Sequence, residues 1–164
     1  LTKTKGKFDY VINIQGDEPF IAPEQIDLLA SLLDGKTELA TLAKKIDDQE
    51  QLFSPNIVKI VVDKGGKALY FSRSPIPHIR NVADNQWLSK HTFYKHIGMY
   101  AYRADILEKI TKLSISTLEK AESLEQLRWL ENGYSIHVSE TTHETIGIDT
   151  PADLEKAILF LQQK

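Results

Sequence analysis

The segment YVINIQGDEP, residues 10–19, sets the architecture of this 164-residue chain. Its first part, up to Gln15, is a short run of mostly apolar and β-branched residues that Gly16 and Pro19 bound, which predicts a buried β-strand. Pro23 suits the first position of a helix, because proline lacks the N–H that would be unpaired there, and apolar residues at helical spacing follow it. A strand followed directly by a helix is typical of an α/β fold.

The rest of the chain alternates between predicted strands and helices. Residues 57–62 and 68–71 flank the turn sequence Asp63-Lys64-Gly65-Gly66, which indicates a β-hairpin. Because the strands of a hairpin are antiparallel, this pattern argues against an entirely parallel sheet. Ser116 and Glu119 have capping-box spacing, and one helix is expected from there to Asn132-Gly133. We therefore predict one α/β domain, residues 1–164, with an open mixed sheet. Further strands are expected at residues 39–43, 94–102, 136–138 and 146–148, and further helices at 23–34, 104–113 and from Thr150 onward.

The composition indicates a globular protein, since 41% of the residues are hydrophobic and 26% are charged. The net charge is −3 and no long run of Lys or Arg occurs, so nothing indicates a nucleic-acid or membrane-surface partner. No apolar run approaches the length of a membrane-spanning helix, and no signal peptide is recognisable. The absence of Cys excludes disulfides and thiolate chemistry and fits a cytoplasmic location.

Two aspartates stand where strands are predicted to end. Asp17 follows the first strand, and Asp149 lies between the last strand and the helix at Thr150. Ligands of α/β sheets gather at the carboxyl ends of strands, and Mg²⁺ is commonly held by one or two carboxylates with substrate phosphates and water. A magnesium site is one interpretation; the other is a turn residue and a helix-entry residue.

The predicted strand 94–102 carries a polar pair around a glycine. His96, Gly98 and Tyr100 share one face, because strand side chains alternate. This arrangement suits a ligand lying against the sheet, and an exposed sheet face explains it as well.

Other polar residues are candidates for binding. Arg73 and Arg80 bracket a proline-containing loop, and arginine binds carboxylates in a bidentate manner, although a loop arginine is more often merely exposed. Glu122, Glu125 and Gln126 would form a polar stripe on their helix, and such stripes are usually solvated.

Six motifs, taken together, identify a family. They are QGDEP at residues 15–19, SPNIVK at 54–59, ALYFSRSPIP at 68–77, HIGMY at 96–100, ESLEQLR at 122–128 and GIDTP at 147–151. In this order they resemble the 3-deoxy-manno-octulosonate cytidylyltransferase (CMP-Kdo synthetase) family over nearly the whole chain. The resemblance implies an open sheet of the nucleotide-diphospho-sugar transferase (Rossmann-like) type, a cytoplasmic homodimer, and Mg²⁺ as cofactor. It implies transfer of a cytidylyl group from CTP to 3-deoxy-manno-octulosonate (Kdo), giving CMP-Kdo and pyrophosphate for lipopolysaccharide biosynthesis.

The same resemblance implies roles for individual residues. Asp17 and Asp149 match the family's magnesium-binding, catalytic aspartates, and Arg73 is a secondary candidate for substrate binding. The positions that match the lining of the Kdo pocket are Gln15, Arg80, His96, Tyr100, Glu125 and Gln126.

One departure from the family concerns the nucleotide. The family's N-terminal loop that grips the CTP triphosphate, and its Ser-Gly-Thr-Glu-type segment, are absent from this sequence, so roughly the first third of the family's length is expected to be missing. The chain alone is therefore expected to be inactive. Two alternatives stay open: a cytidylyltransferase of the CMP-sialic acid synthetase type, and a non-catalytic, truncated fragment that forms dimers.

Overall fold

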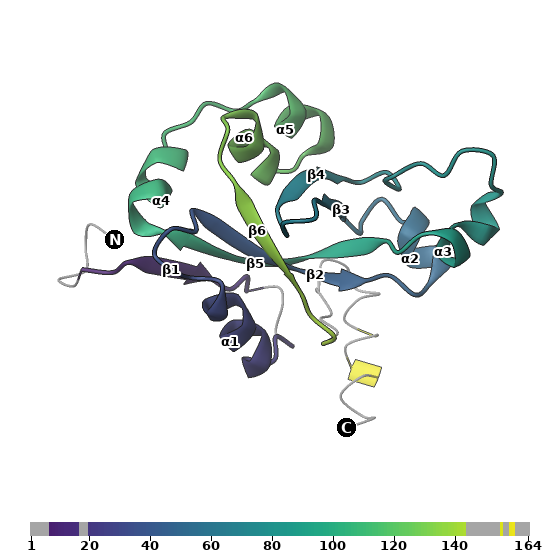
Figure 1. Cartoon of the computed structure of the whole chain (residues 1–164), viewed down its shortest axis with the longest axis horizontal. Helices are drawn as coiled ribbons and strands as arrows, with labels where there is room; N and C mark the ends of the chain where they lie inside the picture. The colour runs from purple at the N-terminus through teal and green to yellow at the C-terminus, as the bar shows by residue number, and fades with distance from the viewer. Residues whose placement is uncertain (1–6, 17–19, 144–154, 156–157, 160–164) are drawn as a thin grey trace.

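The computed structural model describes residues 7–16, 20–143, 155, 158 and 159. Within these residues six strands form one open mixed sheet with helices on both faces (Figure 1), as the sequence predicts. The predicted strand at 146–148 and the predicted helix start at Thr150 lie outside the described residues. The strands are β1 (Tyr10–Asn13), β2 (Leu39–Lys45), β3 (Lys59–Val62), β4 (Ala68–Ser72), β5 (Tyr94–Arg103) and β6 (Ile136–Glu140).

β5 is the central strand of the sheet, whose order is β4-β3-β5-β2-β6. β2 pairs with one edge of β5 and runs parallel to β6, while β3 and β4 form the predicted antiparallel hairpin. β1 and β3 share the other edge of β5. β1 ends with Asn13 opposite Tyr100, and β3 begins with Lys59 opposite Lys95. The carboxyl end of β1 and the beginning of β3 therefore approach the same stretch of β5.

The two faces of the sheet are covered by different helices, since side chains alternate along β5. Ile97 points to one face and packs with Leu29 of α1, while Tyr100 points to the other, which α4, α5 and α6 cover (Figure 1). A further cluster around Trp87 and Phe93 lies beside α2 and α3. The helices are α1 (Pro23–Ser31), α2 (Gln49–Phe53), the 3-10 helix η1 (Asp84–Gln86), α3 (Trp87–Lys90), α4 (Ala104–Ile110), α5 (Thr117–Glu122) and α6 (Gln126–Glu131).

The single helix predicted from Ser116 onward is wrong, because the structure divides it into α5 and α6. Its start is confirmed: the Ser116 hydroxyl accepts the N–H of Glu119, and the Glu119 carboxylate accepts the N–H of Ser116. The chain then turns at Ser123, whose φ of +54° is left-handed. This turn lets Arg128 of α6 pair with Glu119 at 2.5 Å. In one continuous helix the two residues would be about 13.5 Å apart along the axis, so their ion pair favours the break.

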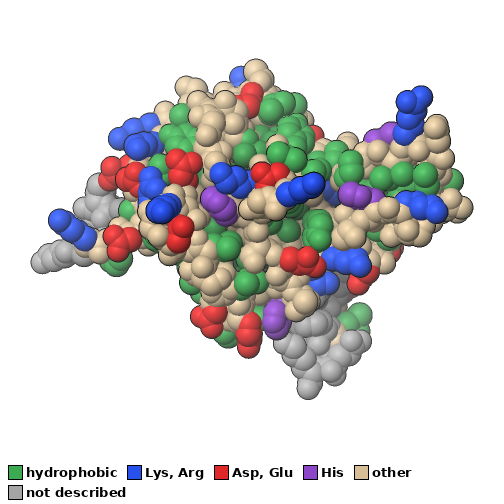
Figure 2. All heavy atoms as spheres, in the orientation of Figure 1, with side chains coloured by type: hydrophobic (Ala, Val, Ile, Leu, Met, Phe, Trp, Pro, Cys, Tyr) green, Lys and Arg blue, Asp and Glu red, His purple; other side chains and the backbone are tan. Residues whose placement is uncertain are grey.

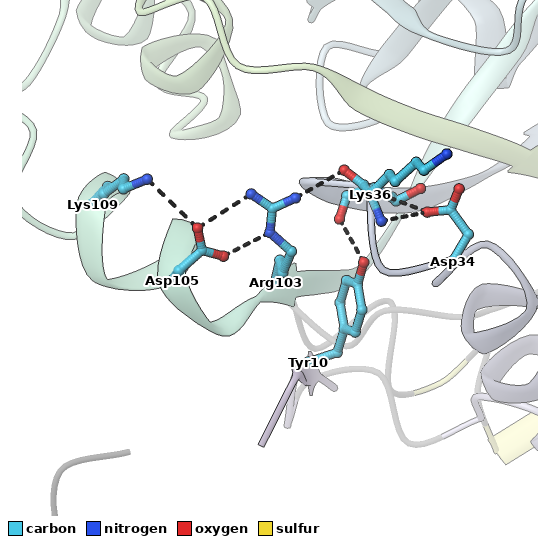
Figure 3. A network of polar contacts seen from close by, with 7 residues as sticks. Tyr10, Asp34, Lys36, Arg103, Asp105 and Lys109 are labelled. Carbon is cyan, nitrogen blue, oxygen red and sulfur yellow. Dashed lines mark hydrogen bonds and ion pairs between the residues drawn. The ribbon is translucent and has the colours of Figure 1, made fainter. Parts of the chain in front are cut away.

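A polar network fastens β1 to the turn before β2 and to α4 (Figure 3). The Tyr10 hydroxyl donates to the carbonyl of Thr37 at 2.9 Å. Arg103, the last residue of β5, donates to the carbonyl of Lys36 at 3.0 Å and pairs with Asp105 of α4 at 2.6 Å. Hydrogen bonding from Arg103 lowers the pKa of Asp105 to about 2. The network therefore anchors β1 at the end of β5 that lies away from the beginning of β3.

The described surface carries charges of both signs. On the face shown in Figure 2, acidic and basic side chains are interspersed, in keeping with the net charge of −3. None of the helices in the described residues has the length and apolar character needed to cross a membrane.

Candidate functional site

His96 and Tyr100 lie on the same face of β5, as strand alternation predicts, and their ring centroids are 5.0 Å apart. This face is covered. Tyr100 is only 5% exposed and packs edge-on against Trp129 of α6, with the centroids 5.2 Å apart. His96 packs edge-on against Phe71 of β4 at 5.3 Å. The interpretation of the pair as part of an exposed sheet face is therefore wrong, because β4 and α6 enclose it.

Thr41 of β2 determines the protonation of His96. The Thr41 hydroxyl lies 2.8 Å from the carbonyl oxygen of Met99, which can only accept, so the hydroxyl proton points there. His96 Nε2 lies 3.0 Å from the same hydroxyl oxygen and therefore donates to it. Burial lowers the pKa of His96 to about 3, so the ring is neutral near pH 7. A neutral ring protonated on Nε2 keeps Nδ1 as a hydrogen-bond acceptor.

The hydroxyl of Tyr100 is buried and finds no hydrogen-bond partner in the described part of the chain. A buried hydroxyl left unpaired costs about 1–3 kcal/mol, so a ligand or water oxygen is expected beside it. Burial, together with interactions with Tyr102 and Glu125, raises the pKa of Tyr100 well above its usual value. The phenol therefore stays protonated and can donate a hydrogen bond.

The beginning of α6 brings two more predicted residues close to the hydroxyl of Tyr100. Glu125 is the N-cap residue of α6 and is exposed, while Gln126 is the first helical residue and only 7% exposed. The solvated-stripe interpretation is therefore wrong for Gln126, because the break at Ser123 separates α6 from α5. Burial is the main cause of the raised pKa of both Tyr100 and Tyr102, and the negative charge of Glu125 raises both pKa values further. Glu125 thus lies within electrostatic range of the unpaired hydroxyl.

The end of β1 approaches the same aromatic residues. Asn13 lies opposite Tyr100, and its side chain hydrogen-bonds the hydroxyl of Tyr102. The first strand, predicted to reach Gln15, ends at Asn13. It is half-buried, because β5 is the only described strand that pairs with it. Gln15 follows two residues later and is exposed. The chain therefore leaves the sheet close to Tyr100.

The two predicted metal ligands, Asp17 and Asp149, lie outside the described residues. Among the residues that the structure describes, no group of three or more His, Asp or Glu side chains could hold a metal ion. Aspartate oxygens are the ligand type that Mg²⁺ takes in proteins. The magnesium site stays a prediction from the sequence.

The two candidate arginines have different surroundings. Arg73 follows β4 and is half-buried, and its guanidinium donates to the carbonyls of Glu122, Pro55 and Ser123 at 2.8, 3.1 and 3.5 Å. Arg80 is exposed in the loop between β4 and η1. Of the two, Arg80 has the guanidinium that is available to a solvent-borne ligand.

Two residues of the site, Thr41 and Tyr102, are not among those predicted from the sequence. Thr41 lies 55 positions from His96, and only the pairing of β2 with β5 joins them. Tyr102 continues the alternation of His96 and Tyr100 on β5, so the same period-two pattern indicates it. Its ring lies 6.0 Å from that of Tyr100.

Comparison with known proteins identifies the family. A family model described as cytidylyltransferase matches residues 2–146. The chain belongs to the cytidylyltransferase family. It is 63% identical over 153 residues to the 3-deoxy-manno-octulosonate cytidylyltransferase of Cytophaga hutchinsonii, covering 93% of this chain and 61% of that protein. It is 56% identical over 162 residues to the protein of the same name from Parabacteroides distasonis, covering 96% and 64%. This member of the family thus spans less than two thirds of the length of these relatives.

Solved structures agree with this assignment. One described as CMP:2-keto-3-deoxy-manno-octonic acid synthetase complexed with CTP matches with a TM-score of 0.85 and 42% identity, covering 97% of this chain and 64% of that one. An inositol-1-phosphate CTP transferase from T. maritima matches with a TM-score of 0.61 at 15% identity, covering 98% and 57%, which supports the fold alone. The predicted resemblance and the predicted nucleotidyltransferase type of open sheet are confirmed.

Proposed function

We propose that this chain provides the sugar-acid half of an enzyme that transfers a cytidylyl group from CTP to Kdo. The observation that carries the proposal is the unpaired, buried hydroxyl of Tyr100 beside the neutral ring of His96. Relatives that are 63% and 56% identical are named 3-deoxy-manno-octulosonate cytidylyltransferases, which supports Kdo as the ligand of this place. The same relatives do not favour the sialic acid alternative.

The polar groups of the predicted site residues suit a polyhydroxylated acid. Tyr100 donates a hydrogen bond to a sugar oxygen, and His96 accepts one at Nδ1 from a sugar hydroxyl. Glu125 and Gln126 supply further acceptors and a donor from the start of α6. Arg80 pairs with the carboxylate of Kdo, since arginine forms bidentate hydrogen bonds with carboxylates. Gln15 contributes an amide from the end of β1.

The proposed reaction needs no covalent enzyme intermediate. The anomeric hydroxyl of Kdo attacks the α-phosphorus of CTP, a new O–P bond forms, the bond to the β-phosphate breaks, and the hydroxyl proton is released. Such transfers depend on positioning and on neutralisation of phosphate charge. We assign Asp17 and Asp149 as the residues that would hold Mg²⁺, which supplies that neutralisation when bound. The described residues contribute by orienting the sugar.

The setting of the reaction also follows from this proposal. CMP-Kdo would serve lipopolysaccharide biosynthesis in the cytoplasm, and the protein would act as a homodimer, a state that sedimentation can measure. Because the chain spans less than two thirds of its relatives, we expect it to make no CMP-Kdo unless the remaining segment of the relatives is supplied.

Substitution of the two aspartates tests the proposed function. In a protein completed with the part of the relatives that this chain does not cover, Asp17→Asn or Asp149→Asn should lower CMP-Kdo formation about 100-fold or more while the protein stays folded, because charge neutralisation in phosphoryl transfer is worth several kcal/mol. Pyrophosphate release in the presence of CTP, Kdo and Mg²⁺ measures this. Asp27→Asn, on the exposed side of α1, is the matched control and should have no effect. Near-normal turnover of both site variants would remove the metal assignment.

A further inference from the structure

A fully buried lysine lies at the start of β3, opposite Lys95 of β5. Lys59 of β3 is 0% exposed, and its ammonium donates to the carbonyls of Ser54, Ile57 and Arg73 at 2.8, 2.6 and 2.5 Å. Burial, aided by the charge of Arg73, lowers the pKa of Lys59 to about 8. Burying a charge is costly unless its protons are all bonded, as they are here. Lys59 therefore holds together backbone segments that lie apart in the sequence.

Glu122 supplies the negative charge of the same cluster. Its carboxylate accepts the Ser72 hydroxyl at 2.7 Å and the backbone N–H of Arg73 at 2.9 Å. Its own carbonyl accepts Arg73 Nε at 2.8 Å, and the carbonyl of Ser123 accepts Arg73 Nη2 at 3.5 Å. Glu122 is thus bonded to the end of β4 through both its side chain and its backbone.

This cluster is attached to the point where the chain turns from α5 into α6. Glu122 is the last residue of α5, Ser123 has the left-handed φ, and Glu125 occupies the N-cap position of α6. The cluster therefore fixes the residue from which α6 starts. The backbone carbonyl of Arg73 also accepts a hydrogen bond from Lys59, which belongs to the strand that pairs with β5. These contacts therefore link the start of α6 to β3, the strand that pairs with β5.

We propose that Lys59, Arg73 and Glu122 form a positioning hub that holds Glu125 and Gln126 at the correct distance from His96 and Tyr100 to bind the sugar acid. The inference rests on the proposed function. Within it, Arg73 acts through the turn at Ser123 and does not contact the substrate. The hub residues are positioning residues, because their polar atoms are bonded to backbone and to each other.

The substitution Glu122→Gln tests the hub at almost unchanged volume. The glutamine amide has one oxygen, and it cannot accept the hydrogen bonds of both the Ser72 hydroxyl and the Arg73 backbone N–H with the strength of a carboxylate. Charge-assisted hydrogen bonds are about twice as strong as neutral ones. We expect the dissociation constant for Kdo, measured by calorimetry on this chain, to rise about fivefold or more. We also expect faster amide exchange over residues 123–131 and unchanged exchange in β2 and β6. Glu108→Gln, on exposed α4 surface, is the matched control and should change neither quantity.

The outcomes separate this inference from the proposed function. If the parent chain binds Kdo and Glu122→Gln lowers only the melting temperature, the hub is merely structural and the inference fails. Tyr100→Phe should weaken Kdo binding with unchanged exchange over 123–131, which distinguishes direct contact from positioning. If the parent chain binds no Kdo, the proposed function fails, and the exchange data still decide whether Glu122 positions α6. Unchanged exchange in Glu122→Gln would overturn the hub.

Discussion

His96 is held neutral by its surroundings. It packs against Phe71 and Tyr100 and donates to Thr41, and burial brings its pKa to about 3. A neutral imidazole keeps an acceptor nitrogen for a sugar hydroxyl, whereas an imidazolium would only donate. The binding step proposed for Kdo therefore requires no titration of His96 near pH 7.

The folded pKa of His96 predicts how stability depends on pH. The unfolded value is about 6.5, so as the pH falls the unfolded state takes up the proton first. The stability that this residue contributes is complete above about pH 6.5 and is lost as the pH falls toward 3, by at most about 1.4 kcal/mol per pH unit. Urea unfolding of His96→Gln should show a correspondingly weaker acid dependence. The exposed His91→Gln is the control. Equal acid dependence in the parent and in His96→Gln would contradict the burial of a neutral ring.

Single residues were predictable where local periodicity applied. The alternation of side chains places His96 and Tyr100 on one face, and the structure agrees. That pattern cannot reveal Thr41, because its contact with His96 depends on the register between β2 and β5. Nor does it reveal that Arg73 donates to backbone carbonyls. The partners of these side chains are distant in sequence, so composition and spacing carry no signal for them.

The break between α5 and α6 is the element that most affects the site. Ser123 adopts φ +54°, which is strained for a residue with a β-carbon, and the helix restarts with Glu125 as its N-cap. The capping box at Ser116 was predictable, since it is a local pattern. The break was not, because the Arg128–Glu119 ion pair and the Glu122 contacts with β4 are tertiary. The helices α1 and α4 also end earlier than predicted, at Ser31 and Ile110.

Substitutions at Ser123 test the break. Glycine adopts positive φ without strain, so Ser123→Gly should leave the free energy of unfolding unchanged or raise it by up to about 1 kcal/mol. A β-branched residue is poorly tolerated there, so Ser123→Val should lower it by about 1–3 kcal/mol. Chemical denaturation of the two variants measures the difference. A Val variant as stable as the Gly variant would argue for a continuous helix.

At the scale of the whole molecule, the mixed sheet followed from the hairpin signal at residues 63–66 and the alternation of strands and helices. The position of β5 at the centre did not follow, because strand order depends on pairings across the chain. This order brings the end of β1, the start of α6 and the His96–Tyr100 pair together. The site is therefore assembled by the order of the strands in the sheet, although most of its residues belong to recognisable motifs.

The covered face of β5 is the proposed binding surface for Kdo, through His96 and Tyr100. Titration of Kdo into the chain with isotope-labelled histidine, observed by NMR, tests it most directly. We predict that the His96 ring signals shift with saturation, that exposed His91 does not respond, and that Tyr100→Phe weakens binding up to about tenfold, the effect of one lost hydrogen bond. An absence of shifts at His96 at saturating Kdo, or equal binding by Tyr100→Phe, would show that this pair does not bind the sugar acid.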